Sequence, residues 1–387
     1  MRYQHLPGPL TAIALVVRAG ARLDGRFPGI AHMAEHMLFQ GTDSLDQLAL
    51  NRRAAELGGE HNADTGYEDI SLTLEVFNED VPAALALLAE QFYRTRVDPE
   101  RLRKERRVVL DELRSRADDP GDYLHTKGWC RFFGGALAHP VVGTWQSLRE
   151  IGATDVTAFL RRCFVHANTV LAIVGGAPVA DARAAVRTHF SHADGRAAPA
   201  APAVVAGGSG RLRLRRLGGG QAYVNKMMTV TPAPRELVAL GVALDVVGAD
   251  PDSRLFQEIR ERLGLGYDVS ATLDWGPDWA VAMVSATAAR GQMDRLLRTV
   301  EETCLRAARD GFDTDELVRA RKKIRYRYAS LAESRLNQAL ALAEGALSGF
   351  PAPAEAERIA ATLSSAEIET AWRRVLTGRA LTVVLAT

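Results

Sequence analysis

Residues 29–42 read GIAHMAEHMLFQGT, and within them His32, Glu35 and His36 form an H-x-x-E-H pentad. On a helix, residues four apart share a face, so both histidines can point at one metal ion. Glu35 lies on nearly the same face, where a carboxylate can act on an attacking water molecule without being a ligand. The order inverts the H-E-x-x-H pentad of zinc-dependent hydrolysis. The pentad therefore predicts metal-dependent hydrolysis, with a buried pair of helical histidines as the structural alternative.

A catalytic zinc site needs a third protein ligand, and residues 99–118 offer candidates. This charged segment lacks glycine and has no proline after its first residue, so it is predicted to be a helix. Its apolar residues recur at helical spacing: Leu102, Val109, Leu110 and Leu113. Glu105 and Glu112 are seven residues apart and share a face. Spacing alone leaves open which glutamate binds metal, and ordinary surface carboxylates are the alternative.

The motifs together resemble the pitrilysin family of zinc metallopeptidases, which includes insulin-degrading enzyme and mitochondrial processing peptidase. In that family H-x-x-E-H is followed about 75 residues later by a helix with E-x6-E, and here Glu112 lies 76 positions after His36. Further stretches that resemble family motifs cover nearly the whole chain: NADT at 62–65, HPVVGT at 139–144, NTVLAIVG at 168–175, SRLF at 253–256 and RERLGLGY at 260–267.

The resemblance implies a role for each residue of the metal site. His32, His36 and Glu112 would bind one Zn²⁺ per chain, and Glu105 would orient a ligand histidine. Glu35 would be the general base that takes a proton from water and passes it to the leaving amine. The implied activity is that of a zinc metalloendopeptidase.

The resemblance also implies how substrate is held. Arg260 and Tyr267 would help to bind the peptide and the oxyanion, and the backbone of Asn62 and Ala63 would pair with an extended peptide. Family members form a closing chamber from four repeats, and this chain carries two. The implied assembly is a homodimer, or a heterodimer with a related subunit, in which Arg260 and Tyr267 serve the partner's zinc site.

The chamber would admit short or unfolded peptides, including leader or targeting peptides. The alternative function is that of a non-catalytic or structural partner subunit of a heterodimeric peptidase. Inactive family members usually lack the pentad or the third ligand, and this chain keeps both. We therefore predict an active peptidase.

The chain is predicted to contain two homologous repeats, 1–191 and 211–387, joined by an Ala/Pro/Gly-rich linker at 192–210. Residues 97–102 align with 312–317 at an offset of 215, which places Ala320 and Arg327 opposite Glu105 and Glu112. The same offset places Val247 opposite His32, Asp250 opposite Glu35 and Pro251 opposite His36. The second repeat would thus lack a metal site. Each repeat alternates β-rich and helical segments, which predicts an α+β fold with a mainly antiparallel sheet packed against helices.

Composition excludes several other classes of protein. The 387 residues carry 48 basic and 47 acidic side chains, so a nucleic-acid partner is not expected. The apolar segment 10–17 is too short to span a membrane and is predicted to be a strand.

Residues 331–347 are predicted to be a helix, and residues 211–216 are predicted to be a strand with one solvated face. The three cysteines are far apart and form no disulfide framework, and a cytoplasmic location is the default expectation.

Overall fold

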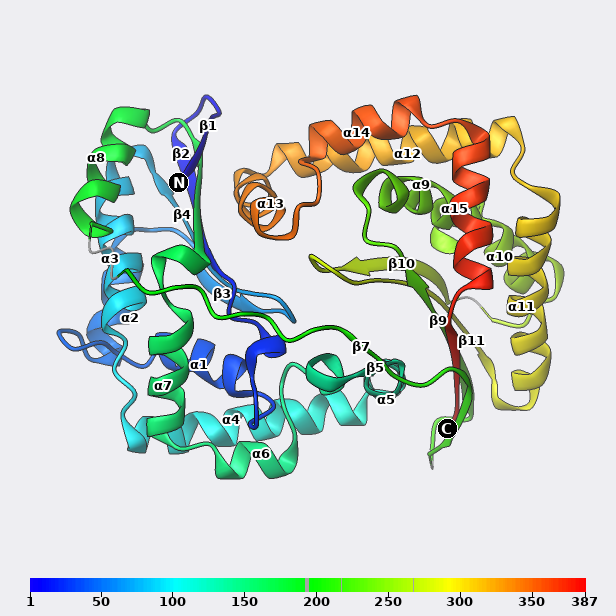
Figure 1. Cartoon of the computed structure of the whole chain (residues 1–387), viewed down its shortest axis with the longest axis horizontal. Coiled ribbons are helices and arrows are strands. Elements are labelled where there is room, and N and C mark those ends of the chain that lie inside the picture. Colours follow the sequence, from blue (N-terminus) through cyan, green and yellow to red (C-terminus); the bar gives the residue numbers. More distant parts are fainter. Residues whose placement is uncertain (192–194, 217, 267) are drawn as a thin grey trace. The chain divides into compact units, whose positions relative to one another are not determined.

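The computed structural model describes residues 1–191, 195–216, 218–266 and 268–387, which form two compact units (Figure 1). Unit 1 contains Met1–Ser115, His139–Ala203 and Leu331–Phe350. Unit 2 contains Arg116–Ala138, Val204–Ser330 and Pro351–Thr387. Each unit thus includes a segment from the other half of the sequence. The division at 191 and 211 stays a prediction, and residues 192–194 of the expected linker lie outside the described residues.

Unit 1 is built on a five-stranded sheet in the order β1-β6-β2-β4-β3. Its strands are β1 (Arg2–His5), β2 (Leu10–Val17), β3 (His61–Thr65), β4 (Ile70–Phe77) and β6 (Thr169–Gly175). The β1–β6 pair is parallel and the other pairs are antiparallel. The predicted strand at 10–17 is β2 at the centre of the sheet. Both faces of β2 are buried, which explains its nearly continuous apolar sequence.

Helices cover both faces of this sheet. The unit's helices are α1 (Ile30–Leu38), α2 (Gln47–Glu56), α3 (Val81–Arg94), most of α4 (Pro99–Asp118), α6 (Trp145–Glu150), α7 (Ala153–Cys163), α8 (Val179–His189) and α13 (Arg335–Ser348). One face carries the larger core, which joins Ile13, Leu15 and Val17 to α1 and α3. On the other face Ala12, Ala14 and Val16 pack against α13. These small side chains allow the helix to approach the strand backbone closely.

The helix predicted at 331–347 is confirmed from residue 335 onward as α13, but its predicted start is wrong. Residues 331–333 end α12 (Thr314–Glu333), and Ser334 interrupts the helical run. The Ser334 hydroxyl accepts a hydrogen bond from the Asn337 N–H at 3.2 Å, so it caps a new helix, α13. This helix packs on the sheet of unit 1, although its sequence lies in the second half. Helical periodicity reports an apolar face but not the element that this face contacts.

Unit 2 contains a second five-stranded sheet in the order β10-β11-β9-β12-β8. Its strands are β8 (Gly210–Arg215), β9 (Gln221–Val230), β10 (Val269–Trp275), β11 (Ala280–Ala289) and β12 (Ala380–Ala386), with a small pair β5 (Phe133–Gly134) and β7 (Val205–Ala206). The β8 arginines are exposed and its leucines are half-buried, as predicted for a strand with one solvated face.

The helices of unit 2 are α5 (Pro120–Phe132), α9 (Pro234–Leu244), α10 (Arg254–Phe256), α11 (Met293–Asp310), α12, α14 (Pro353–Thr362) and α15 (Ser365–Thr377), with π-helical turns at Asp245–Ala249 and Gln257–Arg262. Helix α5 comes from the first half of the sequence and packs on β9 and β12. A Cβ on Gly128 of α5 would lie 3.1 Å from side-chain atoms of Met227 and Val383, so glycine permits this close contact.

The two units repeat one topology. Read from its other edge, the sheet of unit 2 has the order β8-β12-β9-β11-β10, which corresponds strand by strand to unit 1. Each sheet has one parallel pair, β1–β6 or β8–β12. Helices α4 and α12 each have 20 residues and begin 215 positions apart. The predicted α+β fold of two layered repeats, each with a mainly antiparallel sheet, is confirmed.

Candidate metal centre

Helix α1 carries the pentad, and its first turn is fixed by side-chain and backbone contacts. The buried Asp24 carboxylate accepts hydrogen bonds from the N–H groups of Gly29 at 2.6 Å and Ala31 at 3.0 Å. Helix N-termini leave such N–H groups without intrahelical partners, so Asp24 stabilises this end. Gly29 has a φ of +92°, a conformation that favours glycine.

The loop at 139–144 packs directly against this helix start. Gly143 also has a positive φ, and a Cβ there would lie 2.4 Å from the Pro28 carbonyl oxygen. The Ser147 hydroxyl donates a hydrogen bond to the same oxygen at 2.5 Å. These contacts give the HPVVGT segment a structural explanation, because they fix where α1 begins.

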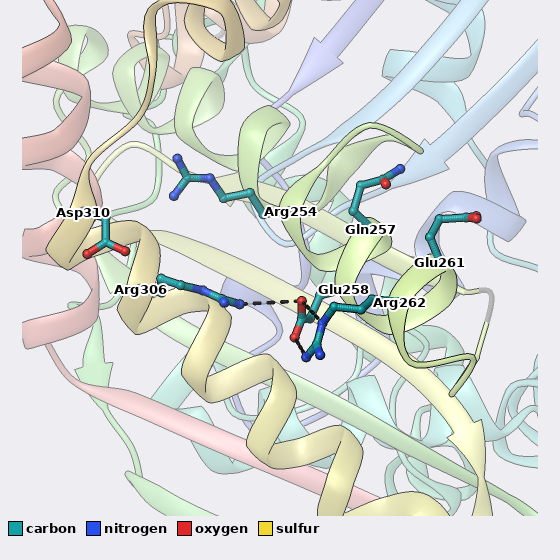
Figure 2. Close-up of a pocket in the computed structure, with 7 residues that line it drawn as sticks. All are labelled: Arg254, Gln257, Glu258, Glu261, Arg262, Arg306 and Asp310. Atoms are coloured by element: carbon teal, nitrogen blue, oxygen red, sulfur yellow. Dashed lines mark hydrogen bonds and ion pairs between the residues drawn. The ribbon is translucent and has the colours of Figure 1, made fainter.

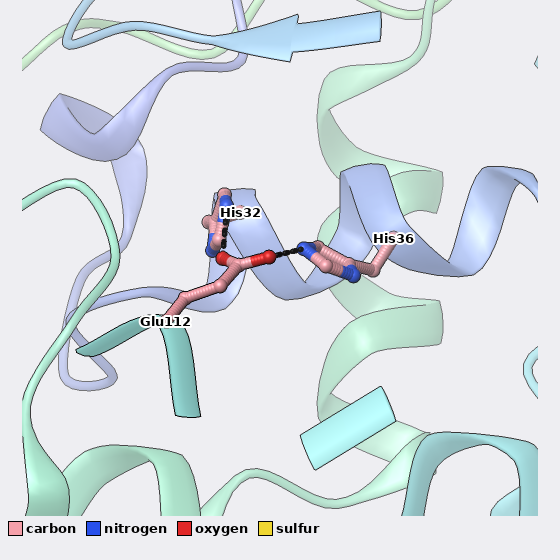
Figure 3. A group of neighbouring side chains, drawn as sticks. All are labelled: His32, His36 and Glu112. Carbon is pink, nitrogen blue, oxygen red and sulfur yellow. Dashed lines mark ion pairs between the residues drawn. The ribbon is translucent and has the colours of Figure 1, made fainter. Parts of the chain in front are cut away.

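The structure brings His32, His36 and Glu112 together, as Figure 3 shows. The Nε2 atom of His32 lies 3.5 Å from one Glu112 oxygen, and Nε2 of His36 lies 3.7 Å from the other. One candidate donor atom from each residue lies within 4.8 Å of the others. Tetrahedral zinc with bonds of about 2.0–2.1 Å separates its ligand atoms by about 3.4 Å. The three side chains therefore fit one zinc ion with modest adjustment.

Glu105 occupies a different place from Glu112. Its Oε2 atom lies 3.0 Å from Nδ1 of His36, which donates the hydrogen bond and leaves Nε2 directed toward Glu112. Burial lowers the pKa of His36, but the Glu105 hydrogen bond and nearby carboxylates outweigh burial and raise it above its usual value. Sequence spacing left the roles of the two glutamates open. The geometry places Glu112 among the candidate ligands, whereas Glu105 contacts the Nδ1 side of the His36 ring.

Glu35 lies beside the three candidate ligands but outside their set. Its Oε2 atom accepts a hydrogen bond from the Thr65 hydroxyl of β3 at 2.9 Å. Burial raises the pKa of Glu35, while nearby His36 and the Thr65 hydrogen bond lower it; the net shift is upward. A raised pKa suits a carboxylate that must take up a proton and release it near neutral pH. The sequence predicted no role for Thr65, although Thr65 lies within the NADT motif.

Replacing Glu105 by glutamine is expected to weaken zinc binding about 10- to 100-fold, the usual cost of losing a partner that orients a ligand histidine. The amide can still accept from Nδ1, but without the negative charge that strengthens this hydrogen bond. Competition with a chromogenic chelator measures the affinity. Glu100→Gln is the matched control, because Glu100 is on the same helix, is 62% exposed and pairs with Lys104. Equal affinities of the Glu105→Gln variant and the wild type would contradict the assigned orientation role.

Comparison with known proteins identifies the family. A model of the insulinase family, peptidase family M16, matches residues 2–140, and a model described as the peptidase M16 inactive domain matches residues 150–324. An uncharacterized zinc protease of Mycobacterium leprae (strain TN) is 30% identical over 340 residues, which cover 83% of this chain and 74% of that protein. The chain belongs to peptidase family M16. The predicted relation to pitrilysin is thereby confirmed.

Other M16 relatives agree with this assignment. The uncharacterized zinc protease YmxG of Bacillus subtilis (strain 168) is 25% identical over 332 residues, covering 81% of this chain and 77% of that protein. A crystal structure of a peptidase M16 inactive domain from Pseudomonas fluorescens has a TM-score of 0.91 at 18% identity, covering 99% of this chain and 94% of that one. A protease from Helicobacter pylori also has a TM-score of 0.91, at 17% identity, covering 100% and 96%. At these identities the two structures show a shared fold.

In this M16 chain, β3 is the last strand at one edge of its sheet. At the two ends of the β3–β4 ladder, the Glu75 N–H donates to the Glu60 carbonyl and the Gly66 N–H donates to that of Asp69. Bonded and non-bonded pairs alternate in an antiparallel ladder, so Asn62 belongs to a bonded pair and its backbone faces β4. The backbone N–H and C=O of Ala63 therefore point to the outer edge. Of the two residues predicted to pair with a peptide, Ala63 has the suitable backbone orientation.

Of the two substrate residues predicted in the second half, Arg260 belongs to unit 2. Arg260 lies in the π-helical turn, is about half exposed, and contacts Glu261 at 3.5 Å and the Phe256 ring at 5.1 Å. Tyr267 lies outside the described residues. The structure does not bring Arg260 together with the metal residues within one unit, so its role and that of Tyr267 stay predictions.

A charged surface groove of about 700 Å³ adjoins the same turn (Figure 2). Its lining residues are Arg254, Gln257, Glu258, Glu261, Arg262, Arg306 and Asp310. Glu258 pairs with both Arg262 and Arg306, and Arg254 pairs with Glu316. Glu258 thus neutralises charge within the groove, whereas the Arg254 charge is balanced by Glu316, which is not a lining residue.

An ion pair replaces metal ligands in unit 2. Arg327, which aligns with Glu112, donates a hydrogen bond to Oδ1 of the buried Asp245 at 2.8 Å. Burial raises the pKa of Asp245, and the neighbouring guanidinium opposes that shift. Lys323 of α12 pairs with Asp250 at 2.9 Å. Throughout the described parts of both units, the only set of His, Cys, Asp or Glu side chains grouped closely enough to share an ion is His32, His36 and Glu112.

A helix that crosses a bilayer must be both long and apolar. Across the portion of the chain that the structure describes, no helix combines the necessary length and apolar character.

Proposed function

We propose that this protein is a zinc-dependent endopeptidase that cleaves short or unfolded peptides. The position of Glu35 carries the proposal. A site that only held a metal ion would need the three ligands, whereas Glu35 is a half-buried carboxylate beside them, held by Thr65 and outside the ligand set. The names of the M16 relatives as zinc proteases support the same chemistry.

His32, His36 and Glu112 would hold the zinc ion, with Glu105 keeping the His36 ring in position. When bound, zinc supplies Lewis-acid chemistry by polarising the scissile carbonyl and lowering the pKa of the attacking water. Glu35 takes the proton from this water and transfers it to the leaving amine. The outer edge of β3 would align the peptide through backbone hydrogen bonds at Ala63.

Metal removal tests the proposal. Dialysis against a strong chelator is expected to abolish cleavage of fluorogenic peptides, and stoichiometric zinc is expected to restore it, because the candidate ligands fit one ion. A control dialysis without chelator should leave activity unchanged. Full activity of metal-free protein would contradict zinc dependence. A wild-type protein that binds zinc but cleaves none of a broad set of peptides would instead favour the alternative of a non-catalytic partner subunit.

We also propose that the active form is a dimer, with Arg260 and Tyr267 acting at the zinc site of the partner subunit. Two inactive variants, Glu35→Gln and Tyr267→Phe, are to be co-expressed with different tags and isolated as mixed dimers. The isolated mixed dimers should have about half of wild-type activity, because one of their two sites is complete. Light scattering measures the molar mass in solution and so shows whether the protein is a dimer. Mixed dimers without activity would show that both residues must come from one chain, and a fully active monomer would exclude the dimer.

A further inference from the structure

Gln91 of α3 links the metal-binding helix to the edge strand β3 of the proposed peptidase site. Its side chain is fully buried, and its Nε2 donates a hydrogen bond to the Leu38 carbonyl at the end of α1, at 3.0 Å. Its Oε1 lies 2.9 Å from Nε2 of His61. A carbonyl oxygen accepts hydrogen bonds only, so the contact with Leu38 fixes the orientation of the amide. His61 Nε2 must therefore carry a proton and donate it to Gln91.

This contact determines what the other ring nitrogen of His61 can do. Burial lowers the pKa of His61, which favours the neutral imidazole. In the neutral form with a proton on Nε2, Nδ1 carries a lone pair and is an acceptor. Among the described residues no partner bonds to Nδ1, and Nδ1 is not among the buried atoms that lack a partner. Nδ1 is thus an acceptor that has no partner among the described residues and is not completely buried.

His61 lies where a bound peptide would pass. The backbone pairing that points Ala63 outward applies equally to His61, two residues earlier on β3. The side chains of His61, Ala63 and Thr65 share the sheet face that carries α1, because their partners on β4 belong to the core on that face. A peptide residue that pairs with His61 would place its Cβ about 4.5–5.5 Å from that of His61 on the same face. The Phe39 ring lies there too, with its centroid 4.9 Å from that of His61.

We infer that His61 is a specificity-determining residue whose Nδ1 accepts a hydrogen bond from a hydroxyl-bearing side chain of the bound peptide. Gln91 is the positioning residue that holds the required tautomer. The inference rests on the proposed peptidase function and names the side-chain class that it selects at one position. Phe39 and Ala63 give this position apolar neighbours, where a hydroxyl loses less hydration energy than an ammonium or guanidinium group.

Matched peptides test the selectivity. Thr/Val and Tyr/Phe pairs differ mainly in the hydroxyl, and each pair is placed at successive positions of one fluorogenic peptide. At one position, wild-type kcat/KM should be about three- to tenfold higher with the hydroxyl, the range for one neutral hydrogen bond. His61→Leu should reduce that ratio to about one, whatever its overall activity. An active wild type without a hydroxyl preference at any position would overturn the inference. A preference for Lys over Met that exceeds the hydroxyl preference at the same position would also overturn it.

Binding and spectroscopy separate this inference from the peptidase proposal. The zinc-loaded Glu35→Gln protein should bind the preferred Thr peptide about three- to tenfold more tightly than its Val counterpart. Long-range ¹H–¹⁵N correlation of histidine-labelled wild type should show the Nε2–H tautomer at His61. Gln91→Met should lose both this single tautomer and the hydroxyl preference. If Gln91 had a purely structural role, the loss of the tautomer would not be accompanied by loss of the hydroxyl preference. An Nδ1–H tautomer in the wild type would refute the assignment even if peptide cleavage were confirmed.

Discussion

The Glu35→Gln variant is expected to bind as much zinc as the wild type and to lose about 10²- to 10⁴-fold in kcat, the contribution of a positioned general base. Glutamine keeps the size of the side chain, and its amide oxygen can still accept the hydrogen bond from Thr65. It cannot take a proton from water at neutral pH. The affinity for peptide should change little, because Glu35 is assigned to proton transfer rather than to substrate binding.

Metal analysis and steady-state kinetics on the same preparation measure this result. Glu56→Gln is a suitable control, because its side chain is 68% exposed on α2 and makes a distant ion pair with Arg53, at 3.9 Å. A Glu35→Gln protein with wild-type turnover would remove Glu35 as the base. A variant that had also lost its zinc would indicate that Glu35 belongs to the ligand set, contrary to its position in the structure.

Glu112→Gln is expected to have a different effect, namely the loss of zinc and of activity together. A neutral amide replaces the only carboxylate in the candidate ligand set, so the fall in zinc affinity should exceed the 10- to 100-fold expected for Glu105→Gln. Zinc should also stabilise the wild type and Glu35→Gln against heat, by about 2.7 kcal/mol at 100 times Kd. At that zinc concentration the Glu112→Gln protein should show almost no such stabilisation.

Calorimetry with and without zinc tests this difference. Asp111→Asn is the matched control on the same helix, because Asp111 is 70% exposed and pairs with Arg114 rather than with a histidine. The control should behave like the wild type, since exposed ion pairs contribute little to stability. If Glu112→Gln kept full zinc affinity and Glu105→Gln lost it, the assignments of the two glutamates would have to be exchanged.

Local sequence predicted the individual elements well. The apolar run 10–17 is β2, and the charged segment 99–118 is α4, with boundaries that agree with the structure. Both depend on short-range physics: buried strands favour apolar side chains, and long charged helices lack internal glycine and proline. The helix predicted at 331–347 was less accurate, because Ser334 can cap a helix or lie within one.

Long-range contacts were outside the reach of these patterns. Nothing in the periodicity of α13 shows that it packs on the sheet of unit 1, because the sequence specifies an apolar face and not its partner. The hydrogen bond from Thr65 to Glu35 spans 30 positions, and that between His61 and Gln91 also spans 30. Such contacts depend on how strands and helices stack, so local spacing does not reveal them.

By itself, the sequence determined that His32, Glu35 and His36 share one helical face, because a spacing of three or four residues is a fixed property of the α-helix. It also determined that the second half of the chain lacks the pentad. Helical spacing could not distinguish Glu105 from Glu112, and the tertiary structure gives them different positions. Both lie on one face of α4, and the packing of α4 against α1 directs one of them to both Nε2 atoms and the other to Nδ1 of His36.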